Sequence, residues 1–378
     1  MINPIDFFNS LIHNEVDFFC GVPDSLLKHL CACIEDKSSP GMHVICANEG
    51  NAVAMACGRQ IASGKLPVVY MQNSGLGNAI NPLVSLADPE VYAIPLLLII
   101  GWRGEPGIHD EPQHKKQGSI SEALLETLNI PFSIMDKDSD YLAILSDMIG
   151  KAKAHSRPVA ILVKKGSFLD YEKETSDSFL PLLREEALDI ILQYMGDSLI
   201  VSTTGKCSRE LYELREKRGE MQRDFLTVGS MGHSSSIATG VALAQTDKRV
   251  LCIDGDGAMI MHMGAMALVG NLAPKNLIHI VINNYCHESV GGQKTSANAI
   301  AFKELAAALS YKHFYQAQTA NKLTESLKEC RSLEGPILLE IQVRQGSRKD
   351  LGRPKSSPKE NKEAFIDAMD IGKNAMGN

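Results

Sequence analysis

The sequence predicts an α/β protein made of two similar, doubly wound parallel-sheet domains. Short runs that are apolar throughout alternate with helical stretches along the whole chain. Such runs are typical of parallel strands, because crossover helices cover both faces of a parallel sheet. The two halves of the chain also repeat the same order of elements, which indicates that one α/β unit occurs twice.

Each half contains a series of predicted strands that lead into turns and helices. In the first half they are DFFCGV (17–22), HVICA (43–47), PVVYMQN (67–73), AIPLLLIIG (93–101) and PVAILVKKG (158–166). In the second half they are SLIVSTTG (198–205), RVLCIDG (249–255), LIHIVINN (277–284) and PILLEIQVRQG (336–346). Because a helix separates each strand from the next, a parallel sheet is expected in each half.

Two pairs of segments carry the similarity between the halves. Segments 157–166 and 335–346 each close a half with a strand and a basic turn, and segments 51–75 and 234–257 share a small-residue helix, a strand and a glycine turn. Between the halves, SFLDYEKETSDSFLP has the polar, acidic composition of a linker. We therefore expect domains at 1–166 and 186–346, a linker at 167–185 and a C-terminal tail at 347–378 that lies near the active site.

Composition and charge exclude some classes of partner. The chain of 378 residues is 44% hydrophobic and 22% charged, with a net charge of −7 and an isoelectric point near 5.9. Such a protein has no global positive field that attracts nucleic acid or an anionic membrane, so we expect neither as a partner.

The cysteines and the apolar runs indicate the compartment. The nine cysteines are scattered and form no CxxC pair, which favours buried thiols in a reducing environment. The N-terminus lacks the basic start and apolar core of a signal peptide. The longest apolar run, AIPLLLIIGW, is too short to cross a membrane. We therefore expect a cytoplasmic protein.

A glycine turn with two carboxylates follows one strand of the second half. Residues 253–261 read IDGDGAMIM, so Asp254 and Asp256 lie where a strand and a helix often cradle a phosphate. Two carboxylates would repel a phosphate, but a divalent cation removes this repulsion because it binds both kinds of oxygen. The next strand ends at Asn283-Asn284, and parallel strands end at one edge, so an asparagine amide should meet Asp256. The alternative is ordinary turn chemistry, in which Asp and Gly are frequent.

This spacing resembles the cofactor motif of the thiamine diphosphate (ThDP) enzymes, in which GDG is followed by a helix, a strand and an asparagine pair. The resemblance implies the ThDP-binding fold, with a pyrimidine-binding domain at 1–166, a diphosphate-binding domain at 186–346, and ThDP and Mg²⁺ as cofactors. It implies that Asp256, Asn284 and the carbonyl of Cys286 bind the metal, although the family usually has glycine at this last position. Diphosphate contacts are then expected from Thr203, Thr204, Gly205, Gly255, Gly257 and Ala258.

Two further segments resemble elements with which this family bends and activates its cofactor. Glu49, in ICANEGNAVAMACG, matches the glutamate that hydrogen-bonds the aminopyrimidine ring. An acidic residue in this position also favours a helix N-terminus, which is the alternative. In GSMGHSSSIATGVALA, the carbonyl of Gly229 and the N–H of Met231 would hold the pyrimidine, with the Met231 side chain under the bent cofactor. A lone methionine in an apolar segment is otherwise more often a core residue.

The chain has no room for the middle domain that many of these enzymes carry, and it resembles the phosphonopyruvate decarboxylases. The resemblance is carried by GWRGEPGIHDEPQHKKQG (101–118), NNYCHESVGGQKT (283–295) and GSRKDLGRPKSSP (346–358). It implies decarboxylation of 3-phosphonopyruvate to phosphonoacetaldehyde and CO₂. A substrate with a carboxylate and a phosphonate requires cations. The candidates, each of them more often a surface charge, are Arg103, Lys115, Lys116, Lys294 and Arg348.

Completion of the reaction requires an acid near the substrate. Asp24, in the strand-to-helix turn CGVPDSLL, is one candidate, and a helix N-cap is its alternative role. The other candidates are His109, His114 and His287, because histidine titrates near neutral pH. The sequence does not rank these residues.

Two other functions stay open at this point. Decarboxylation of sulfopyruvate or of another 2-oxo acid is the nearer alternative. A non-catalytic dinucleotide-binding module is the distant one, although the chain lacks a GxGxxG turn with the expected acidic residue. The family builds its active sites between subunits, so the resemblance implies at least a homodimer.

Overall fold

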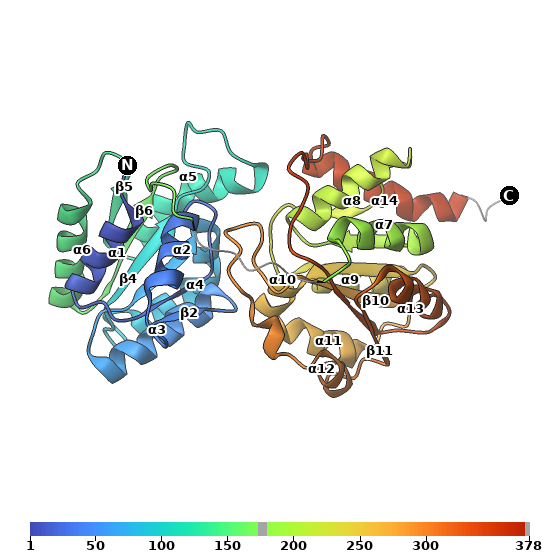
Figure 1. Ribbon diagram of the computed structural model, residues 1–378, viewed down its shortest axis with the longest axis horizontal. Helices are drawn as coiled ribbons and strands as arrows, with labels where there is room; N and C mark the ends of the chain where they lie inside the picture. Colours follow the sequence, from blue (N-terminus) through green and yellow to red (C-terminus); the bar gives the residue numbers. More distant parts are fainter. Residues whose placement is uncertain (173–179, 375–378) are drawn as a thin grey trace. The chain divides into compact units, whose positions relative to one another are not determined.

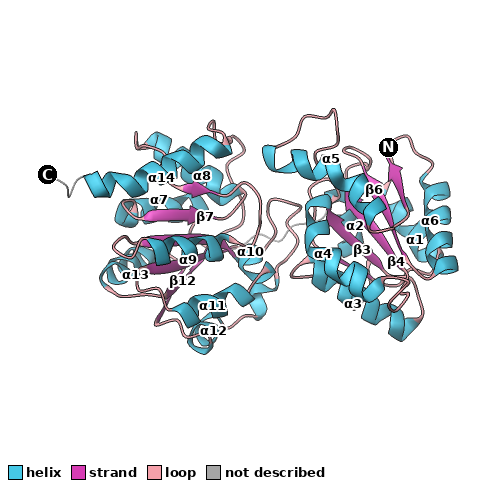
Figure 2. Cartoon of the chain, turned by 180° about the vertical axis from the view of Figure 1, so that it is seen from behind, coloured by secondary structure: helices cyan, strands magenta, loops and turns pink. Residues whose placement is uncertain are grey.

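The computed structural model describes residues 1–172 and 180–374, which form two compact units (Figure 1). The first unit comprises Met1–Thr175 and His287–Lys294, and the second comprises Ser176–Cys286 and Thr295–Asn378. Each unit is a sheet with helices on both faces (Figure 2). Part of the expected linker, 173–179, and the last residues of the expected tail, 375–378, lie outside the described residues.

The first unit is a six-stranded sheet in which all neighbouring strands are parallel, in the order β2-β1-β3-β4-β6-β5. The strands are β1 (Phe19–Gly21), β2 (His43–Ile45), β3 (Val68–Gln72), β4 (Leu96–Gly101), β5 (Phe132–Met135) and β6 (Pro158–Val163). The α-helices are α1 (Pro4–His13), α2 (Lys28–Lys37), α3 (Glu49–Ser63), α4 (Leu76–Pro82), α5 (Pro112–Thr127) and α6 (Tyr141–His155).

The core of the first unit consists of one apolar cluster on each face of the sheet. Leu97 and Ile99 of β4 belong to one cluster, and Leu98 and Ile100 belong to the other. Successive side chains of a strand point to opposite faces, so a strand covered on both sides is apolar throughout. This explains why the run LLLIIG contains no polar residue.

The second unit has the same architecture, with six parallel strands in the order β11-β12-β10-β9-β7-β8. The strands are β7 (Leu199–Ser202), β8 (Phe225–Leu226), β9 (Val250–Gly255), β10 (Leu277–Asn283), β11 (His313–Ala317) and β12 (Ile337–Gln342). The α-helices are α7 (Arg184–Met195), α8 (Lys206–Lys217), α9 (Ser234–Ala244), α10 (Asp256–Met261), α11 (Gly264–Leu272), α12 (Phe302–Ala308), α13 (Ala320–Ser332) and α14 (Pro358–Asn374).

The predicted fold class is confirmed, but the predicted number of strands is wrong. The structure adds β5, β8 and β11, all of which lie at a sheet edge or have only two residues. The side chains of β5 and β11 are mostly half-buried. Their sequences therefore lack the continuous apolar run that identifies a strand covered on both faces.

The order of the strands identifies one edge of each sheet where ligands are expected. In the second unit the chain passes from β7 outward to β8 and then back to β9 on the other side of β7. In the first unit it passes from β1 to β2 and then to β3 on the other side of β1. Open α/β sheets bind their ligands outside the carboxyl ends of the strands at such a point of reversal.

The tail after residue 346 is part of the second unit. Asn361 of α14 donates to the carbonyl of Asp224 at 2.8 Å and accepts from the amide of Leu226 at 3.0 Å, so its side chain pairs with the edge of β8. Phe365 packs against Phe225 with ring centroids 5.6 Å apart. None of the described helices is long and apolar enough to cross a membrane.

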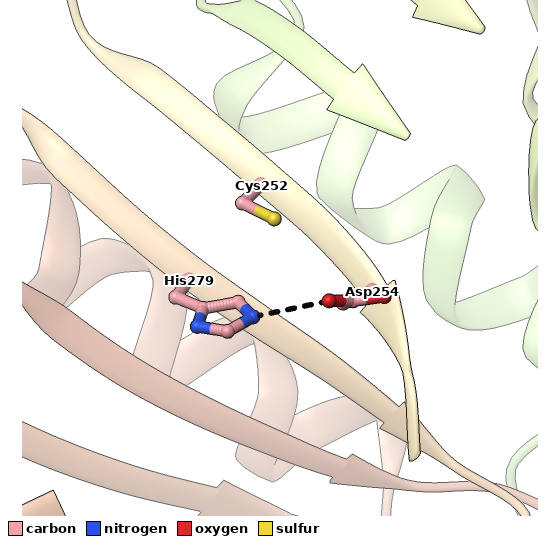
Figure 3. A group of neighbouring side chains, drawn as sticks. All are labelled: Cys252, Asp254 and His279. Atoms are coloured by element: carbon pink, nitrogen blue, oxygen red, sulfur yellow. Dashed lines mark ion pairs between the residues drawn. The ribbon is translucent and has the colours of Figure 1, made fainter. Parts of the chain in front are cut away.

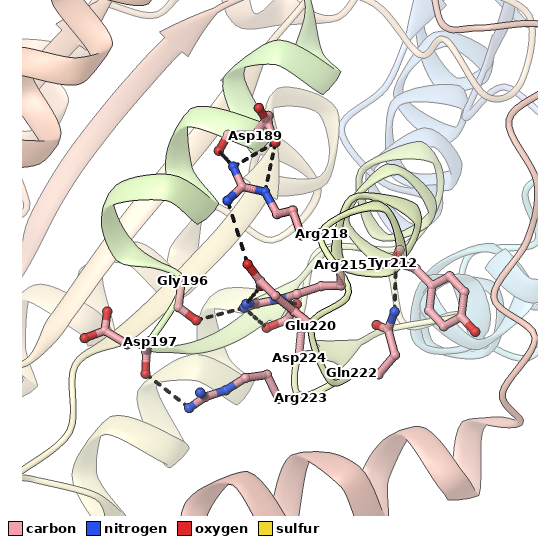
Figure 4. A network of polar contacts seen from close by, with 10 residues as sticks. All are labelled: Asp189, Gly196, Asp197, Tyr212, Arg215, Arg218, Glu220, Gln222, Arg223 and Asp224. Atoms are coloured by element: carbon pink, nitrogen blue, oxygen red, sulfur yellow. Dashed lines mark hydrogen bonds and ion pairs between the residues drawn. The ribbon is translucent and has the colours of Figure 1, made fainter.

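A network of ion pairs fixes the segment between α8 and β8 (Figure 4). The Arg215 guanidinium donates to both carboxylate oxygens of Asp224 at 2.8 Å, and it also contacts Glu220 and the carbonyl of Gly196. Arg215 and Asp224 are 2% and 0% exposed. Pairing of this kind is required, because a buried charge without a partner is strongly destabilising.

Candidate active site

The glycine turn of the second unit follows β9, next to the carboxyl ends of β7 and β10. Asp256 is the first residue of α10 and is 3% exposed. Its Oδ2 accepts a hydrogen bond of 2.5 Å from the Thr295 hydroxyl. Burial raises the pKa of Asp256 to about 6, against the effect of Thr295 and nearby backbone amides. A carboxylate in such a place favours a bound cation, which would offset the loss of solvation.

The two asparagines after β10 have different roles. Asn283 is fully buried, donates to Glu340 at 2.8 Å and accepts from the amide of Tyr285 at 3.1 Å, so its amide belongs to the fold. Asn284 lies in the turn itself, where its Oδ1 faces the amide of Cys286 at 3.2 Å. Tyr285, which lies between Asn284 and Cys286, has a φ of 61°, a backbone conformation that residues with side chains adopt mostly in tight turns.

The three residues predicted to bind the metal therefore lie in two adjacent turns of one unit. The carboxylate of Asp256 interacts with the backbone of Asn284, and Cys286 follows two residues later. Carboxylate, amide and carbonyl oxygens are the ligands that Mg²⁺ prefers. The residues present thus fit a hard divalent cation, and their role as its ligands stays a prediction.

The turn after β7 has the features of a phosphate-binding site. The hydroxyl of Thr203 is buried, and it has no hydrogen-bond partner among the residues that the structure describes. The same holds for the hydroxyl of Ser234 at the start of α9. Gly205 has a φ of 99°, in the region that favours glycine, and α8 begins at the next residue. Unsatisfied buried donors beside the Asp256 turn fit an anionic ligand that completes them.

The segment with Met231 lies against α10, the helix that begins at Asp256. A β-carbon on Gly232 would stand 3.0 Å from the carbonyl of Ala258 in α10, and Gly232 has a φ of 85°. Met231 is half-buried rather than part of the core. Gly232 therefore packs against α10, and the role of Gly229 and Met231 in holding the pyrimidine stays a prediction.

In the first unit, Glu49 opens α3 and is 5% exposed. Its Oε2 accepts from Asn78 at 2.8 Å, whereas the helix is capped by the side chain of Asn48. A residue that only favours a helix N-terminus would be expected in solvent. The burial of Glu49 and its contact with Asn78 favour the predicted functional role.

Asp24 follows β1 and is completely buried. Its Oδ2 accepts from the amides of Leu26 at 3.0 Å and Leu27 at 3.3 Å, while its Oδ1 is buried without a partner in the described parts of the chain. Burial raises the pKa of Asp24 to about 6, although the positive charge of Arg103 acts in the opposite direction. A carboxyl group of this kind can hold and release a proton near neutral pH.

Arg103 and His114 are joined by a residue that the sequence did not identify. Asp110 accepts from Nε of Arg103 at 2.7 Å, and its Oδ1 lies 2.9 Å from Nδ1 of His114. Burial lowers the pKa of His114 below its ordinary value, so the ring is neutral at pH 7. Asp110 resembles an ordinary turn residue, because nothing in its local sequence shows which side chains it contacts.

The remaining candidates are less closely connected. His109 and Lys115 are exposed, as is Lys294. Burial lowers the pKa of His287 to about 4, so this ring is neutral near pH 7. Arg348 contacts Glu185 at 2.6 Å and also Glu213, so its charge is used within the second unit to anchor the tail.

The side chain of Asp254 is fully buried and lies toward that of His279 (Figure 3). Its Oδ2 lies 3.6 Å from Nε2 of His279, and Cys252 is on the same face of β9. His279 also contacts the hydroxyl of Tyr311 at 3.1 Å through Nδ1. The four side chains form a buried polar group within the second unit, separate from the predicted metal ligands.

In the second unit, the turn of Asp256 and Asn284 and the buried hydroxyls of Thr203 and Ser234 fit the metal and the diphosphate of a ThDP-binding enzyme. Two family descriptions match the chain. Residues 6–125 match "Thiamine pyrophosphate enzyme, N-terminal TPP binding domain", and residues 203–341 match the corresponding C-terminal TPP binding domain. Thiamine pyrophosphate is another name for ThDP, so ThDP is the cofactor.

Curated relatives indicate which kind of ThDP enzyme the chain is. The phosphonopyruvate decarboxylase of Streptomyces viridochromogenes is 35% identical over 95% of this chain and 93% of its own. That of Streptomyces hygroscopicus is 34% identical over 95% and 92%. A sulfopyruvate decarboxylase of Methanosarcina acetivorans is 26% identical over 95% of both chains. The chain belongs to the phosphonopyruvate decarboxylase family of ThDP-dependent carboxy-lyases.

Proposed function

We propose that the protein decarboxylates 3-phosphonopyruvate to phosphonoacetaldehyde and CO₂, with ThDP and Mg²⁺ as cofactors. The observation that carries this proposal is the 35% identity to a phosphonopyruvate decarboxylase over nearly the whole length of both chains. Asp256 and Asn284 are buried and would supply oxygen ligands for the metal of such an enzyme.

When bound, ThDP supplies the nucleophilic carbon and the electron sink for the loss of CO₂. Asp256, Asn284 and the carbonyl of Cys286 would hold Mg²⁺, and the hydroxyl of Thr203 would donate to the diphosphate. Glu49 would hold a proton shared with the pyrimidine ring.

Binding and protonation of the substrate would fall to the first unit. Arg103 lies beside Asp24, and the charge of each affects the pKa of the other. An arginine suits the oxygens of a carboxylate or phosphonate. Asp24, with a pKa of about 6, is the proposed group that carries the proton. His114 is the proposed second proton carrier, because it is held in the same cluster.

Sulfopyruvate is the second candidate substrate, because the relative from Methanosarcina acetivorans matches this chain over the same share of its length. Release of CO₂ should be measured with phosphonopyruvate, sulfopyruvate and pyruvate in the presence of ThDP and Mg²⁺. We expect the highest kcat/KM with phosphonopyruvate. An equal or higher value with sulfopyruvate would refute the proposed substrate.

We also propose that the protein self-associates in the cytoplasm, with active sites at the subunit interface. The neighbouring helices α9 and α11 carry exposed apolar side chains, and Leu243, Leu268 and Leu272 are 49%, 50% and 42% exposed. Exposed apolar side chains on adjoining helices are candidates for a protein interface. Light scattering should show at least a dimer that dissociates in Leu268→Glu. The same change at the exposed Leu142 of the first unit should not affect assembly.

A further inference from the structure

The loop between β4 and α5 is organised around one carboxylate, that of Asp110. It accepts from the amide of Gly104 at 2.9 Å and from that of Glu111 at 2.7 Å. It also accepts from two nitrogens of Arg103, with a distance of 2.7 Å to Nε, and contacts Nδ1 of His114 at 2.9 Å. The side chain of Asp110 is 13% exposed. A single carboxylate therefore holds both ends of the loop and two candidate active-site residues.

These contacts leave Arg103 little freedom. Its Nε and Nη2 donate to Asp110, and its Nη1 donates to the hydroxyl of Ser25 at 2.8 Å. The backbone of Arg103 is fixed as well, because Asn73 donates to its carbonyl at 2.8 Å and accepts from its amide at 3.2 Å. The guanidinium is thus held beside the buried carboxyl group of Asp24, next to the turn that follows β1.

Asp110 also determines which nitrogen of His114 carries the proton. An ionised carboxylate can only accept a hydrogen bond, so the Nδ1 that faces it must be protonated. The pKa of Asp110 is held well below its usual range by the hydrogen bonds from Arg103 and His114, which outweigh the effect of burial. In the neutral ring, Nε2 is therefore the atom with the lone pair. A carboxylate that orients a histidine in this way is a recurrent device in proton transfer.

The loop packs closely against α5 at two glycines. A β-carbon on Gly104 would stand 2.0 Å from the carbonyl oxygen of His114, and one on Gly118 would stand 1.7 Å from the carbonyl oxygen of Gly104. The loop is therefore packed directly onto the first turns of α5. Its geometry is set in advance, which favours a role that requires fixed positions.

We infer that Asp110 is a positioning residue, which holds Arg103 beside Asp24 and fixes His114 so that Nε2 is the atom that exchanges protons with the reacting molecule. This inference rests on the proposed decarboxylase function and deepens it. It assigns to Asp110 no contact with the substrate. The carboxylate orients the Arg103 guanidinium, and one N–H group on each of Nη1 and Nη2 is left to donate to an anion.

The test compares Asp110→Asn, Asp110→Glu and the matched control Asp138→Asn, an exposed aspartate of the same unit. We expect Asp110→Asn to lower kcat/KM by about 10²- to 10⁴-fold, the range seen when an orienting carboxylate is lost. Asp110→Glu should restore part of the loss, and Asp138→Asn should equal the wild type. Binding of ThDP, followed by thermal shift, should be unchanged in all three.

A role in orientation is distinguished from a general structural role by two further measurements. His114→Gln identifies the limb of the pH profile of kcat/KM that depends on His114. The charge of Asp110 raises the pKa of His114, so this limb should move to lower pH in Asp110→Asn. The double variant Asp110→Asn/His114→Gln should lose less than the sum of the single losses, because both act through one group. Additive losses and an unmoved pH limb would overturn the inference.

A crystal structure of Asp110→Asn gives a readout without substrate. We expect the Arg103 guanidinium and the His114 ring to leave their positions, and unchanged positions would also overturn the inference. If the wild type does not decarboxylate phosphonopyruvate, the proposed function fails by itself. The kinetic comparison is then made with the 2-oxo acid that the enzyme does accept, and the crystal structure still decides the role of Asp110.

Discussion

Gly75 and Glu49 are so close that a β-carbon on Gly75 would stand 2.3 Å from Oε1 of Glu49. Real β-carbons are essentially never found within 3.0 Å of a heavy atom outside their own residue and its chain neighbours. The second carboxylate oxygen is held by Asn78 at 2.8 Å. Gly75 and Asn78 thus contact the Glu49 carboxylate from two sides, and any side chain larger than that of glycine at position 75 would clash with it.

Gly75→Ala should therefore displace Glu49 and reduce kcat by about 10²-fold, the effect of moving a catalytic group by roughly 1 Å. The control is Gly77→Ala in the same region, because a β-carbon on Gly77 meets no atom within 4 Å. Steady-state kinetics at saturating ThDP and Mg²⁺ would measure both variants. Wild-type kcat in Gly75→Ala would show that the position of Glu49 does not limit the reaction.

Glu49→Gln keeps the size of the side chain and removes its charge. We expect the variant to retain the thermal shift caused by ThDP and Mg²⁺, because the predicted metal and diphosphate contacts lie in the other unit. Turnover should fall by more than about 10²-fold, as for the loss of a group that moves a proton. Glu90→Gln, an exposed glutamate of the same unit, serves as the control. Full activity of Glu49→Gln would contradict the assignment.

Asp24 should make the folded protein less stable at neutral pH. Its pKa is raised from 3.8 to about 6 in the folded state, so folding binds a proton, and stability falls as the pH rises from about 4 to 6. Asp24→Asn removes this effect. Above pH 6 the variant should be more stable than the wild type by at most roughly 3 kcal/mol, at 1.36 kcal/mol per pKa unit.

The difference between Asp24→Asn and the wild type should vanish below pH 4, where both side chains are neutral. Thermal unfolding at pH 4 and pH 8 measures it, and a variant less stable than the wild type at pH 8 would contradict the role of burial. The same variant should lose activity. A residue that reduces stability and is needed for the reaction is expected at an active site.

The sequence predicted the fold from patterns that depend only on neighbouring residues. Runs such as LLLIIG are apolar because both faces of their strand are covered, and this is visible without a structure. The sequence HFYQA of β11 could not be recognised as a strand in this way, because its side chains are mostly half-buried at a sheet edge and it has no continuous apolar run. A two-residue strand such as β8 carries no pattern at all.

Some residues of the candidate site were also predicted from the sequence, and others were not. Asp256 and Asn284 were predicted from a motif that resembles that of the ThDP enzymes, and the sheet places them at the ends of the neighbouring strands β9 and β10. Asp110 and Asn78 were missed, because their roles depend on contacts with Arg103 and Glu49 that no local pattern shows. The charge of Arg348 was expected to bind substrate, and its ion pairs with glutamates of the second unit could not be read from the sequence.

The pair of Arg215 and Asp224 should be essential for the stability of the second unit. Arg215→Met leaves the fully buried Asp224 without its partner, which costs about 3–5 kcal/mol for a buried pair. The double variant Arg215→Met/Asp224→Leu removes both charges and should recover most of this loss. Arg331→Met, at an exposed arginine, is the control. Denaturant unfolding measures all three, and equal loss in the single and double variants would contradict the argument.

The last prediction concerns the metal. Asp256 is buried, and Thr295 donates to its Oδ2, but an amide in its place would keep the shape of the turn and lose the charge that attracts Mg²⁺. Asp256→Asn should therefore abolish the thermal shift that ThDP produces in the presence of Mg²⁺, as EDTA should in the wild type. In the absence of both cofactors the variant should be as stable as the wild type or more stable, because burial raises the pKa of Asp256 to about 6 and so opposes its ionisation. Asp247→Asn, at an exposed position shortly before β9, should respond to the cofactors like the wild type. A full shift in Asp256→Asn would show that the metal is held by other residues.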